Sequence, residues 1–501
     1  MKKPFLFLAS TLAAASCTVT EQKPNVVVLY IDDLDFEELG YCANNAYTPF
    51  IDSLAAQSMQ FSNYYVAAPV STPSRYSSLT GRYASHSSSF AQQEKCDPAF
   101  IRWNAKIVKG KDKTVAEYLR PLGYKSGFVG KWHNGQPIGE KKLAKNDEKD
   151  PEFNSKMKEI YKTMRAYVHE NSGFDYAESI YANNLHAIGL PLPLQQHNME
   201  WVTKGALDFL KQTDADEPFF LWFSTTVPHG PNPIGSLRGD ARITAGGLLD
   251  APITDVQPSR ESVLARAKEK GIKPQYAGMI WLDDALRVLF NRLEEMNVLD
   301  NTLIIFASDN GEKQGKMTCY QAAAHLPAFV YWKGKIKPMT CDELTSNIDI
   351  LPTVLDFCGE RKIAQAAELD GESWKNMLLK NKPLKREAIY TEVVYQRAII
   401  TKDWKYIATR FPESVSKNVT PENRKNYSIE GVASKDYYRN DRDYPAYYDD
   451  NQLYDLTVDP VEQHNVYDDP ANIKEVARMR KIMQSFVAGL PFDFGEFKSK
   501  K

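Results

Sequence analysis

Long apolar runs alternate with helical patterns through most of the chain. The runs NVVVLYI, YKSGFVG, PFFLWFS and NTLIIFAS are continuous and rich in β-branched and aromatic residues, which is typical of strands covered on both faces. Apolar residues at helical spacing occur between them, as in residues 49–59 and 278–297. This alternation predicts an α/β fold over residues 25–380, with a large, mostly parallel sheet and helices on both faces.

The pattern changes near residue 381. Residues 387–410, EAIYTEVVYQRAIITKDWKYIATR, favour antiparallel strands with a turn near Lys402 and Asp403. Residues 476–490 have the spacing of an amphipathic helix that packs on these strands. We therefore expect a smaller C-terminal α+β subdomain with an antiparallel sheet over residues 381–501.

The N-terminal segment has the pattern of an export signal. MKKPFLFLASTLAAASC has two lysines, a short apolar stretch and small residues up to Cys17, and it is too short to span a bilayer. Its Ala-Ala-Ser-Cys ending resembles a bacterial lipobox, in which the cysteine is acylated, although Ala14 stands where leucine is usual. We favour residues 1–17 as a signal with lipidation of Cys17, and residues 18–24 as a tether. Cleavage without lipidation is the alternative.

This segment predicts an exported bacterial protein, either periplasmic or an outer-membrane lipoprotein, whose only membrane attachment is a lipid anchor. The 62 Lys and Arg residues nearly balance the 64 Asp and Glu residues, so no nucleic acid is expected as a partner. The other five cysteines are widely spaced and odd in number, which favours neither a zinc site nor a disulfide framework; most are expected to be buried thiols. They are Cys42, Cys96, Cys319, Cys341 and Cys358.

Polar side chains follow four of the predicted strands. In chain order they are Asp32 and Asp33, then Lys131 and His133, then His229, and finally Asp309 and Asn310. Each has a structural explanation when taken alone, because acidic pairs favour turns and single histidines or lysines are usually structural or solvated. The carboxyl ends of parallel strands, however, meet at one edge of a sheet, where ligands bind. Their convergence there favours a functional site.

The candidate ligand atoms at this edge are all oxygens. Carboxylate and amide oxygens suit a hard cation, Ca²⁺ or as second choice Mg²⁺, rather than zinc. Lys131, His133 and His229 add cationic or donor groups around such an ion. The combination favours an anionic ester, sulfate or phosphate, on which a metal would act as a Lewis acid.

The stretch PVSTPSRYSSLTGRY adds a candidate reactive residue. Thr72 as N-cap, Pro73 at the first turn and Gly81 after the end predict a short helix over residues 72–80. Ser71 would then precede a helix N-terminus, where free N–H groups attract anions. Ser71 could serve only the helix cap, but Arg75 lies on the same face and can reach an anion or a carboxylate.

These residues resemble the type I sulfatases, members of the alkaline phosphatase superfamily. The family signature is Cys or Ser, any residue, Pro, a small residue and Arg, and the chain has Ser71-Thr72-Pro73-Ser74-Arg75 followed by YSSLTGRY. The similarity continues in family order through NVVVLYIDD, GYKSGFVGKWH, PFFLWFSTTVPHGP, NTLIIFASDNG and LYDLTVDPVEQHNV, so it covers nearly the whole mature chain. It implies an alkaline-phosphatase-like fold and a serine-type bacterial sulfatase.

The resemblance implies that Ser71 is a precursor. In this family the residue is oxidised to formylglycine, and a serine here implies an anaerobic sulfatase-maturating enzyme as a transient partner. The hydrated aldehyde is then the nucleophile. Its gem-diol can expel sulfate by collapsing to the aldehyde, whereas a plain serine would need a base and would leave a covalent sulfate.

The resemblance also implies a role for each site residue. Asp32, Asp33, Asp309 and Asn310, with modified Ser71, would bind one Ca²⁺. Arg75 and Lys131 would hold the formylglycine and the sulfate oxygens, and His133 would take a proton as the hemiacetal collapses. His229 with Lys316 would protonate or stabilise the leaving alcohol. The short segment after SDNG makes Lys313 the fallback for Lys316, and His325 stands where a structural arginine is common.

The expected reaction is hydrolysis of a sulfuric ester. The expected substrate is a sulfated mono- or oligosaccharide attacked by exo action, because the lipoprotein signal resembles those of glycan-degrading bacteria.

Residues 435–450 are rich in tyrosine and charge; we slightly favour a solvated loop over a sugar subsite. That subsite would contain Tyr437, Tyr438, Arg439 and Arg442. The remaining histidines are expected to be structural or on the surface: His86, His169, His186, His197 and His464.

Two other functions stay open at this point. One is a phosphate-ester or phosphonate hydrolase on the same scaffold, although a single metal site with two histidines and two lysines differs from a two-zinc phosphatase. The other is a catalytically inactive glycan-binding lipoprotein, which would result if Ser71 is not matured.

Overall fold

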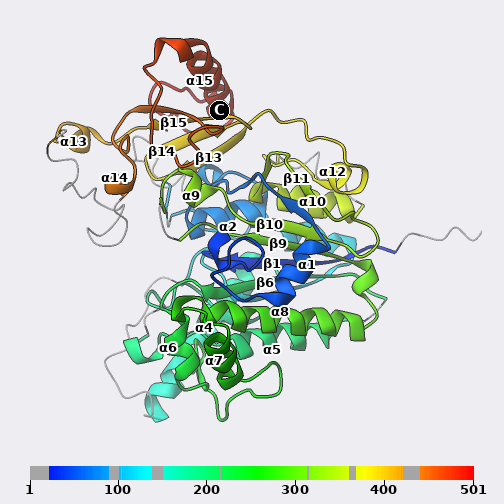
Figure 1. The fold of residues 1–501 in the computed structure, drawn as a ribbon. Helices are drawn as coiled ribbons and strands as arrows, with labels where there is room; N and C mark the ends of the chain where they lie inside the picture. The colour runs from blue at the N-terminus through cyan, green and yellow to red at the C-terminus, as the bar shows by residue number, and fades with distance from the viewer. Residues whose placement is uncertain are drawn as a thin grey trace, which may run out of the picture.

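The computed structural model describes residues 22–89, 101–102, 104–137, 151–188, 190–214, 216–312, 315–359, 368–418, 420, 422 and 440–500. A mixed sheet of eight strands forms the centre of the larger domain, in the order β11-β2-β10-β9-β1-β6-β4-β5 (Figure 1). The strands from β9 to β5 run parallel, and β10 is antiparallel to both of its neighbours. The predicted mostly parallel sheet is therefore confirmed.

The strands of this sheet are β1 (Asn25–Asp32), β2 (Met59–Phe61), β4 (Lys125–Lys131), β5 (Tyr176–Tyr181), β6 (Phe219–Pro228), β9 (Thr302–Ser308), β10 (Ala328–Tyr331) and β11 (Met339–Cys341). Two short pairs form separate sheets, β3 (Tyr64–Tyr65) with β12 (Thr345–Ser346), and β7 (Ile243–Thr244) with β8 (Gly247–Leu248).

Helices cover both faces, which explains why the strand sequences are continuously apolar. Along β1, Val27 and Leu29 belong to one buried cluster, and Val26 and Val28 belong to the other. The first cluster contains residues of α1 (Pro49–Ala56), α4 (Pro151–Ser172), α5 (Met199–Leu210), α6 (Pro233–Arg238), α7 (Arg260–Glu269) and α8 (Ala277–Glu295). The second contains residues of α2 (Ser71–Thr80), α3 (Val115–Leu119), α10 (Ile350–Phe357) and α12 (Lys375–Lys380).

The C-terminal part has an antiparallel sheet of four strands, as predicted. They are β13 (Ile389–Val393), β14 (Gln396–Ile400), β15 (Trp404–Thr409) and β16 (Asn451–Asp455). The turn between β14 and β15 includes Lys402 and Asp403. Helix α15 (Ile473–Val487) packs on one face of this sheet through Met479, Ile482 and Met483.

The other face of the C-terminal sheet packs on the larger domain. Val393 and Ile407 of this sheet share a buried cluster with Val70, Met317 and Tyr320. Val70 directly precedes α2, and Tyr320 directly precedes α9 (Gln321–Ala324). Figure 1 shows the sheet and α15 stacked over α2 and α9. The C-terminal sheet therefore fixes two loops that lie at the carboxyl edge of the central sheet.

The start of α2 differs from the prediction. The helix begins at Ser71, Val70 takes the N-cap position in an extended conformation, and no side chain caps the helix. The Thr72 hydroxyl is buried without a hydrogen-bond partner, so the proposed Thr72 cap is wrong. The other end is as predicted, because Gly81 adopts the left-handed conformation with φ of 66°.

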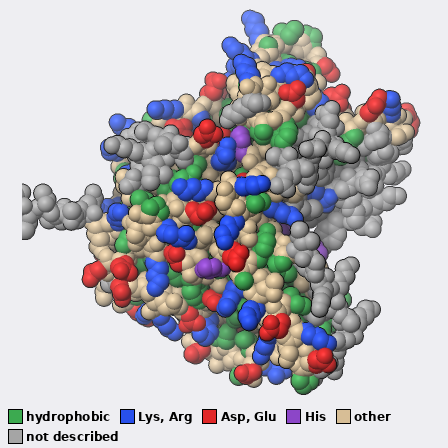
Figure 2. Space-filling view, turned by 180° about the vertical axis from the view of Figure 1, so that it is seen from behind, with side chains coloured by type: hydrophobic (Ala, Val, Ile, Leu, Met, Phe, Trp, Pro, Cys, Tyr) green, Lys and Arg blue, Asp and Glu red, His purple; other side chains and the backbone are tan. Residues whose placement is uncertain are grey.

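The surface carries charges of both signs. Figure 2 shows Lys and Arg interspersed with Asp and Glu over one face of the molecule. Among the described residues, no helix is both long and apolar enough to cross a membrane. Cys17, the rest of the signal and Cys96 lie outside the described residues. Cys319, Cys341 and Cys358 are buried free thiols, whereas Cys42 is exposed.

The His197 side chain is a buried, neutral ring that links the segment before α5 to β6 through hydrogen bonds. Its Nε2–H donates to the Pro231 carbonyl at 2.9 Å, and its Nδ1 accepts from the Thr226 hydroxyl at 2.9 Å. Burial lowers the pKa of His197 to about 4. The ordinary pKa of 6.5 applies in the unfolded chain, so between these values the unfolded state binds more protons and stability falls as the pH falls.

We therefore expect the apparent Tm advantage of the wild type over His197→Gln to shrink as the pH falls from about 7.5 to about 5, because glutamine does not titrate. Scanning calorimetry of both proteins at each pH measures this difference. A difference that stays constant over the range would show that His197 is not held neutral by the fold.

Candidate active site

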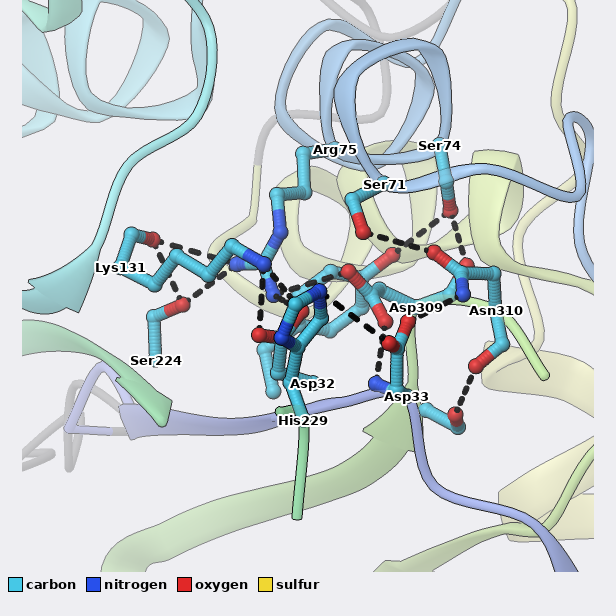
Figure 3. A network of polar contacts seen from close by, with 12 residues as sticks. Asp32, Asp33, Ser71, Ser74, Arg75, Lys131, Ser224, His229, Asp309 and Asn310 are labelled. Atoms are coloured by element: carbon cyan, nitrogen blue, oxygen red, sulfur yellow. Dashed lines mark hydrogen bonds and ion pairs between the residues drawn. The ribbon is translucent and has the colours of Figure 1, made fainter. Parts of the chain in front are cut away.

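The carboxyl ends of four neighbouring strands meet at one edge of the sheet and bring the predicted polar residues together (Figure 3). Asp32 ends β1, Lys131 ends β4, His229 follows β6 and Asp309 follows β9. Side chains of a strand alternate between its faces, but Asp33 adopts a left-handed conformation with φ of 57°. This ends the alternation after Asp32, so both carboxylates reach the same site.

Three carboxylates form the centre of the site. Oxygens of Asp32, Asp33 and Asp309 lie within 4.8 Å of one another, and all three residues are buried. The Asp33 backbone N–H donates to Asp309 Oδ1 at 2.9 Å. The Asn310 amide donates to Asp33 Oδ1. Oxygen ligands in this arrangement fit a hard divalent cation.

Three buried cations pair with these carboxylates. Lys131 Nζ lies 2.6 Å and 2.7 Å from the two oxygens of Asp32. Arg75 Nη2 lies 3.0 Å from Asp32 Oδ1 and 2.8 Å from Asp309 Oδ2. Lys316 Nζ lies 2.5 Å from Asp33 Oδ2. We call these residues the charged cluster: Asp32, Asp33, Asp309, Arg75, Lys131 and Lys316.

The three carboxyl groups differ in how well their charge is compensated. Burial alone would raise the pKa of Asp32 and of Asp33, but Lys131 and Lys316 respectively outweigh it and hold each pKa well below its ordinary value. Burial raises the pKa of Asp309 to about 7; Arg75 opposes this shift, and the charges of Asp32 and Asp33 add to it. A divalent cation among the three carboxylates would stabilise the charged form of Asp309.

Ser71 is the first residue of α2 and is only 2% exposed. Its hydroxyl donates to Asn310 Oδ1 at 2.9 Å, which places Ser71 beside the oxygen ligands. Three residues later in α2, the Ser74 hydroxyl donates to the Asp309 carbonyl at 2.5 Å. Two side chains of α2 therefore hold the 309–310 segment.

Arg75 is fixed on the side opposite its carboxylate partners. Its Nη1 donates to the Ser224 hydroxyl at 2.5 Å and to the Lys131 carbonyl at 3.1 Å. Its guanidinium lies 5.4 Å from the centre of the Tyr30 ring. Sequence reasoning missed Ser224, because a serine inside an apolar strand gives no signal until β4 and β6 are paired.

The two predicted histidines are both buried at the site. His229 Nδ1 donates to the Gly230 carbonyl at 2.7 Å, so Nε2 faces Asp33 Oδ2 at 3.4 Å. Burial lowers the pKa of His229 to about 4, with the Asp33 carboxylate opposing the shift. Burial also holds the pKa of His133 well below its ordinary value, and the positive charges of Lys131 and Arg75 add to this effect.

Lys316 is 3% exposed and contacts the charged centre, whereas Lys313 lies outside the described residues. Its Nζ also donates to Glu312 Oε2 at 2.5 Å. Burial, together with the Asp33 carboxylate, raises the pKa of Glu312 to about 9. Glu312 is a second residue that sequence reasoning missed, although it lies in the SDNGEKQGK segment that was singled out.

The remaining candidates lie elsewhere. Tyr437, Tyr438 and Arg439 are outside the described residues, and Arg442 is exposed on α14 (Asn440–Asp443). The His325 ring stacks on Tyr65 at a distance of 4.9 Å. Of the histidines expected to be structural or on the surface, His86 and His197 make buried contacts, and His169, His186 and His464 are exposed.

A family model described as Sulfatase matches residues 24–360. The chain belongs to the sulfatase family. This agrees with the oxygen-rich centre beside a serine at the start of α2. Membership supports hydrolysis of a sulfate ester, and the buried aspartates of this sulfatase could bind the metal ion that the family generally uses.

Two curated relatives match the sulfatase over nearly its whole length. An N-acetylgalactosamine-6-O-sulfatase of Bacteroides thetaiotaomicron is 26% identical over 536 residues, with 93% of this chain and 94% of the relative covered. Human arylsulfatase A is 24% identical, with 96% of this chain and 90% of the relative covered.

Solved structures show the same fold. One, from work on glycosaminoglycan metabolism by Bacteroides thetaiotaomicron, has a TM-score of 0.62 and 22% identity and covers 93% of this chain and 99% of its own. Another was solved in complex with its substrate D-glucosamine-2-N,6-O-disulfate. It has a TM-score of 0.57 and 17% identity, and the match covers 95% of this chain and 100% of that structure. The sulfatase fold, with its second antiparallel sheet, is thus confirmed.

We expect Ca²⁺ to raise the Tm of the metal-stripped protein, because a ligand that binds only the native state stabilises it by about 2.7 kcal/mol at a hundredfold excess over Kd. Asp309→Asn keeps the size of the side chain but removes its charge, so most of this shift should disappear. Asp240→Asn is the matched control, because Asp240 pairs with Arg242 at the surface. Equal Ca²⁺ shifts in wild type and Asp309→Asn would contradict this metal site.

Proposed function

We propose that the protein is a carbohydrate sulfatase that uses one Ca²⁺ and a formylglycine derived from Ser71. The observation that carries this proposal is the contact of Ser71 Oγ with Asn310 Oδ1 at 2.9 Å, beside three buried carboxylates. Nucleophile precursor, metal ligands and cationic side chains thus share one small site. That combination suits attack on an anionic ester.

The charge balance of the site supports an anionic substrate. The charged cluster contains three carboxylates and three cations, and the pKa of Glu312 near 9 keeps this fourth carboxyl group protonated at neutral pH. A divalent cation would therefore leave the site with surplus positive charge. A sulfate ester can neutralise part of that charge, and Arg75 and Lys131 can donate to its oxygens.

The environment of Ser71 supports its modification. Its hydroxyl donates to an amide oxygen, which is a poor base, so this contact would not activate a plain serine. A hydrated formylglycine supplies a nucleophile that can release sulfate again by returning to the aldehyde. His133 is neutral near pH 7 because burial lowers its pKa, so it can accept a proton in that return step.

We assign protonation and stabilisation of the leaving alcohol to His229 and Lys316. Both contact Asp33 Oδ2, His229 at 3.4 Å and Lys316 at 2.5 Å, so they lie on one side of the site. The low pKa of His229 makes its neutral form dominant near pH 7, so Lys316 is the resident proton donor and stabilises charge on the leaving oxygen. His229 then orients or relays that proton.

A sulfated mono- or oligosaccharide is the proposed substrate, with exo action. The names of the relatives support a sugar, since one is an N-acetylgalactosamine-6-O-sulfatase and one neighbour was solved with a disulfated glucosamine. The export segment supports the location of a bacterial lipoprotein anchored through Cys17, and the serine at residue 71 supports an anaerobic maturase as partner. Matured protein incubated with a panel of sulfated sugars and matching phosphate esters tests this assignment.

Ser71→Ala should abolish sulfate release from every substrate and lower the Tm by only a few degrees, because the loss of one buried hydrogen bond costs about 1 to 3 kcal/mol. Ion chromatography measures the sulfate. Intact mass of the Ser71 peptide from the native host should show the loss of two hydrogen atoms. An unmodified Ser71 peptide in active enzyme would overturn the formylglycine assignment and retain the sulfatase reaction.

His229→Ala should reduce kcat on a sugar sulfate by about a hundredfold or more, the range of a lost acid–base group. An aryl sulfate has a better leaving group, so its kcat should fall far less. Both substrates are measured with the same enzyme preparations. Equal losses on both would assign His229 to binding rather than to proton transfer.

A further inference from the structure

The Ser224 hydroxyl lies between the Arg75 guanidinium and the backbone of Lys131 (Figure 3). It accepts from Arg75 Nη1 at 2.5 Å and donates to the Lys131 carbonyl at 2.7 Å. Arg75 Nη1 also donates to the same carbonyl at 3.1 Å. These three groups therefore form a closed triangle of hydrogen bonds, and Ser224 is fully buried inside β6.

The pairing of β4 with β6 places this hydroxyl. Gly130 and Ser224 are the last paired residues of the two strands. Gly130 has φ of 95°, and a Cβ there would overlap the backbone carbonyl oxygen of Ser224. Glycine is therefore required at this position. Because the strands approach so closely, the carbonyl of the next residue, Lys131, lies within hydrogen-bond distance of the Ser224 side chain.

The fold engages four of the five N–H donors of Arg75. Nη1 uses two, for Ser224 and the Lys131 carbonyl. Nη2 pairs with Asp32 at 3.0 Å and with Asp309 at 2.8 Å. Nε is buried, and among the described residues it has no hydrogen-bond partner. A buried charged donor without an acceptor is costly, which identifies Nε–H as the donor that Arg75 keeps for a ligand.

This donor lies on the side of the nucleophile precursor. Nε is the guanidinium nitrogen nearest to the arginine backbone, whereas Nη1 and Nη2 reach from α2 to the strands. Ser71 precedes Arg75 by four residues in the same helix, and residues at this spacing share a helix face. A hydroxyl of hydrated formylglycine at residue 71, or a sulfate oxygen beside it, can therefore accept from Nε.

We propose that Ser224 is a positioning residue that fixes the Arg75 guanidinium with Nε–H directed at the sulfate group. This inference rests on the proposed sulfatase function, and it concerns recognition of the sulfate rather than of the sugar. A hydroxyl can donate to the Lys131 carbonyl and accept from Arg75 at once. Because it is neutral, it also leaves the positive charge of Arg75 for the substrate, whereas a carboxylate at residue 224 would compete with the sulfate.

Binding of inorganic sulfate tests this role without turnover. Calorimetry measures the Kd of sulfate for the Ca²⁺-loaded Ser71→Ala protein. The added change Ser224→Ala should raise this Kd at least about tenfold, the range expected when a hydrogen bond to a charged group is lost.

Ser126→Ala is the matched control, because Ser126 is a similarly buried serine of β4 whose hydroxyl also makes two hydrogen bonds. It donates to Asp175 Oδ2 at 2.8 Å and accepts from the Asp175 backbone N–H at 3.1 Å, so neither bond involves Arg75. Ser126→Ala should lower the Tm about as much as Ser224→Ala but change the Kd of sulfate by less than about twofold. This comparison separates positioning of Arg75 from a general loss of stability.

Ser224→Cys is a second variant that keeps nearly the size of the side chain and replaces the oxygen with a weaker acceptor. It should weaken sulfate binding in the same direction, and it carries the test if Ser224→Ala does not fold. In matured enzyme, either variant should lower kcat/KM by the same factor for a sugar sulfate and an aryl sulfate, because Arg75 acts on the sulfate and not on the leaving group.

Unchanged sulfate binding in the Ser224 variants, no sulfate binding by the Ser71→Ala parent, or a loss of activity confined to the sugar sulfate would overturn this assignment. If the Ser224 variants weaken sulfate binding as expected but matured wild type cleaves no sulfate ester, the role of Ser224 stands and the sulfatase proposal is refuted.

Discussion

The buried ion pairs of the charged cluster are the interaction on which this site depends. Moving a charged group from water into the interior costs several kcal/mol, and only close pairing with good hydrogen bonds offsets that cost. Here each aspartate has a cationic partner, at distances from 2.5 to 3.0 Å. The pairs join segments that are far apart in sequence, so the native fold is the state in which these charges can be buried together.

Packing outside the cluster holds these segments at the required distances. Asn347 donates from its amide to the Ser74 hydroxyl at 2.8 Å and accepts from the Ala67 backbone N–H at 2.7 Å, which supports α2 from behind. Asn134 donates to the Thr72 carbonyl at 2.8 Å and so ties the segment after Lys131 to the same helix. The C-terminal sheet adds apolar contacts with Val70 and Met317. The smaller subdomain therefore contributes to the site mainly by positioning Ser71 and Lys316.

Sequence was sufficient for the parts of the site that follow from strand ends. Asp32, Lys131 and Asp309 could be placed together because parallel strands covered on both faces have a clear apolar pattern and ligands gather at their carboxyl edge. Ser224 and Glu312 could not, since a single polar residue has no periodicity and its partner is defined only by strand pairing and by side-chain burial. The start of α2 was placed one residue late, because Thr72 is a good N-cap by type but the chain enters the helix through extended Val70.

The electrostatic character of the site follows from its construction. Around the carboxylates of the site, Arg75, Lys131 and Lys316 cancel the negative charge, so adding a divalent cation leaves a surplus that favours an anion. Because water-poor surroundings strengthen this effect, the preference for an anionic ester can arise from the distribution of buried charge, without a dedicated contact to every sugar hydroxyl.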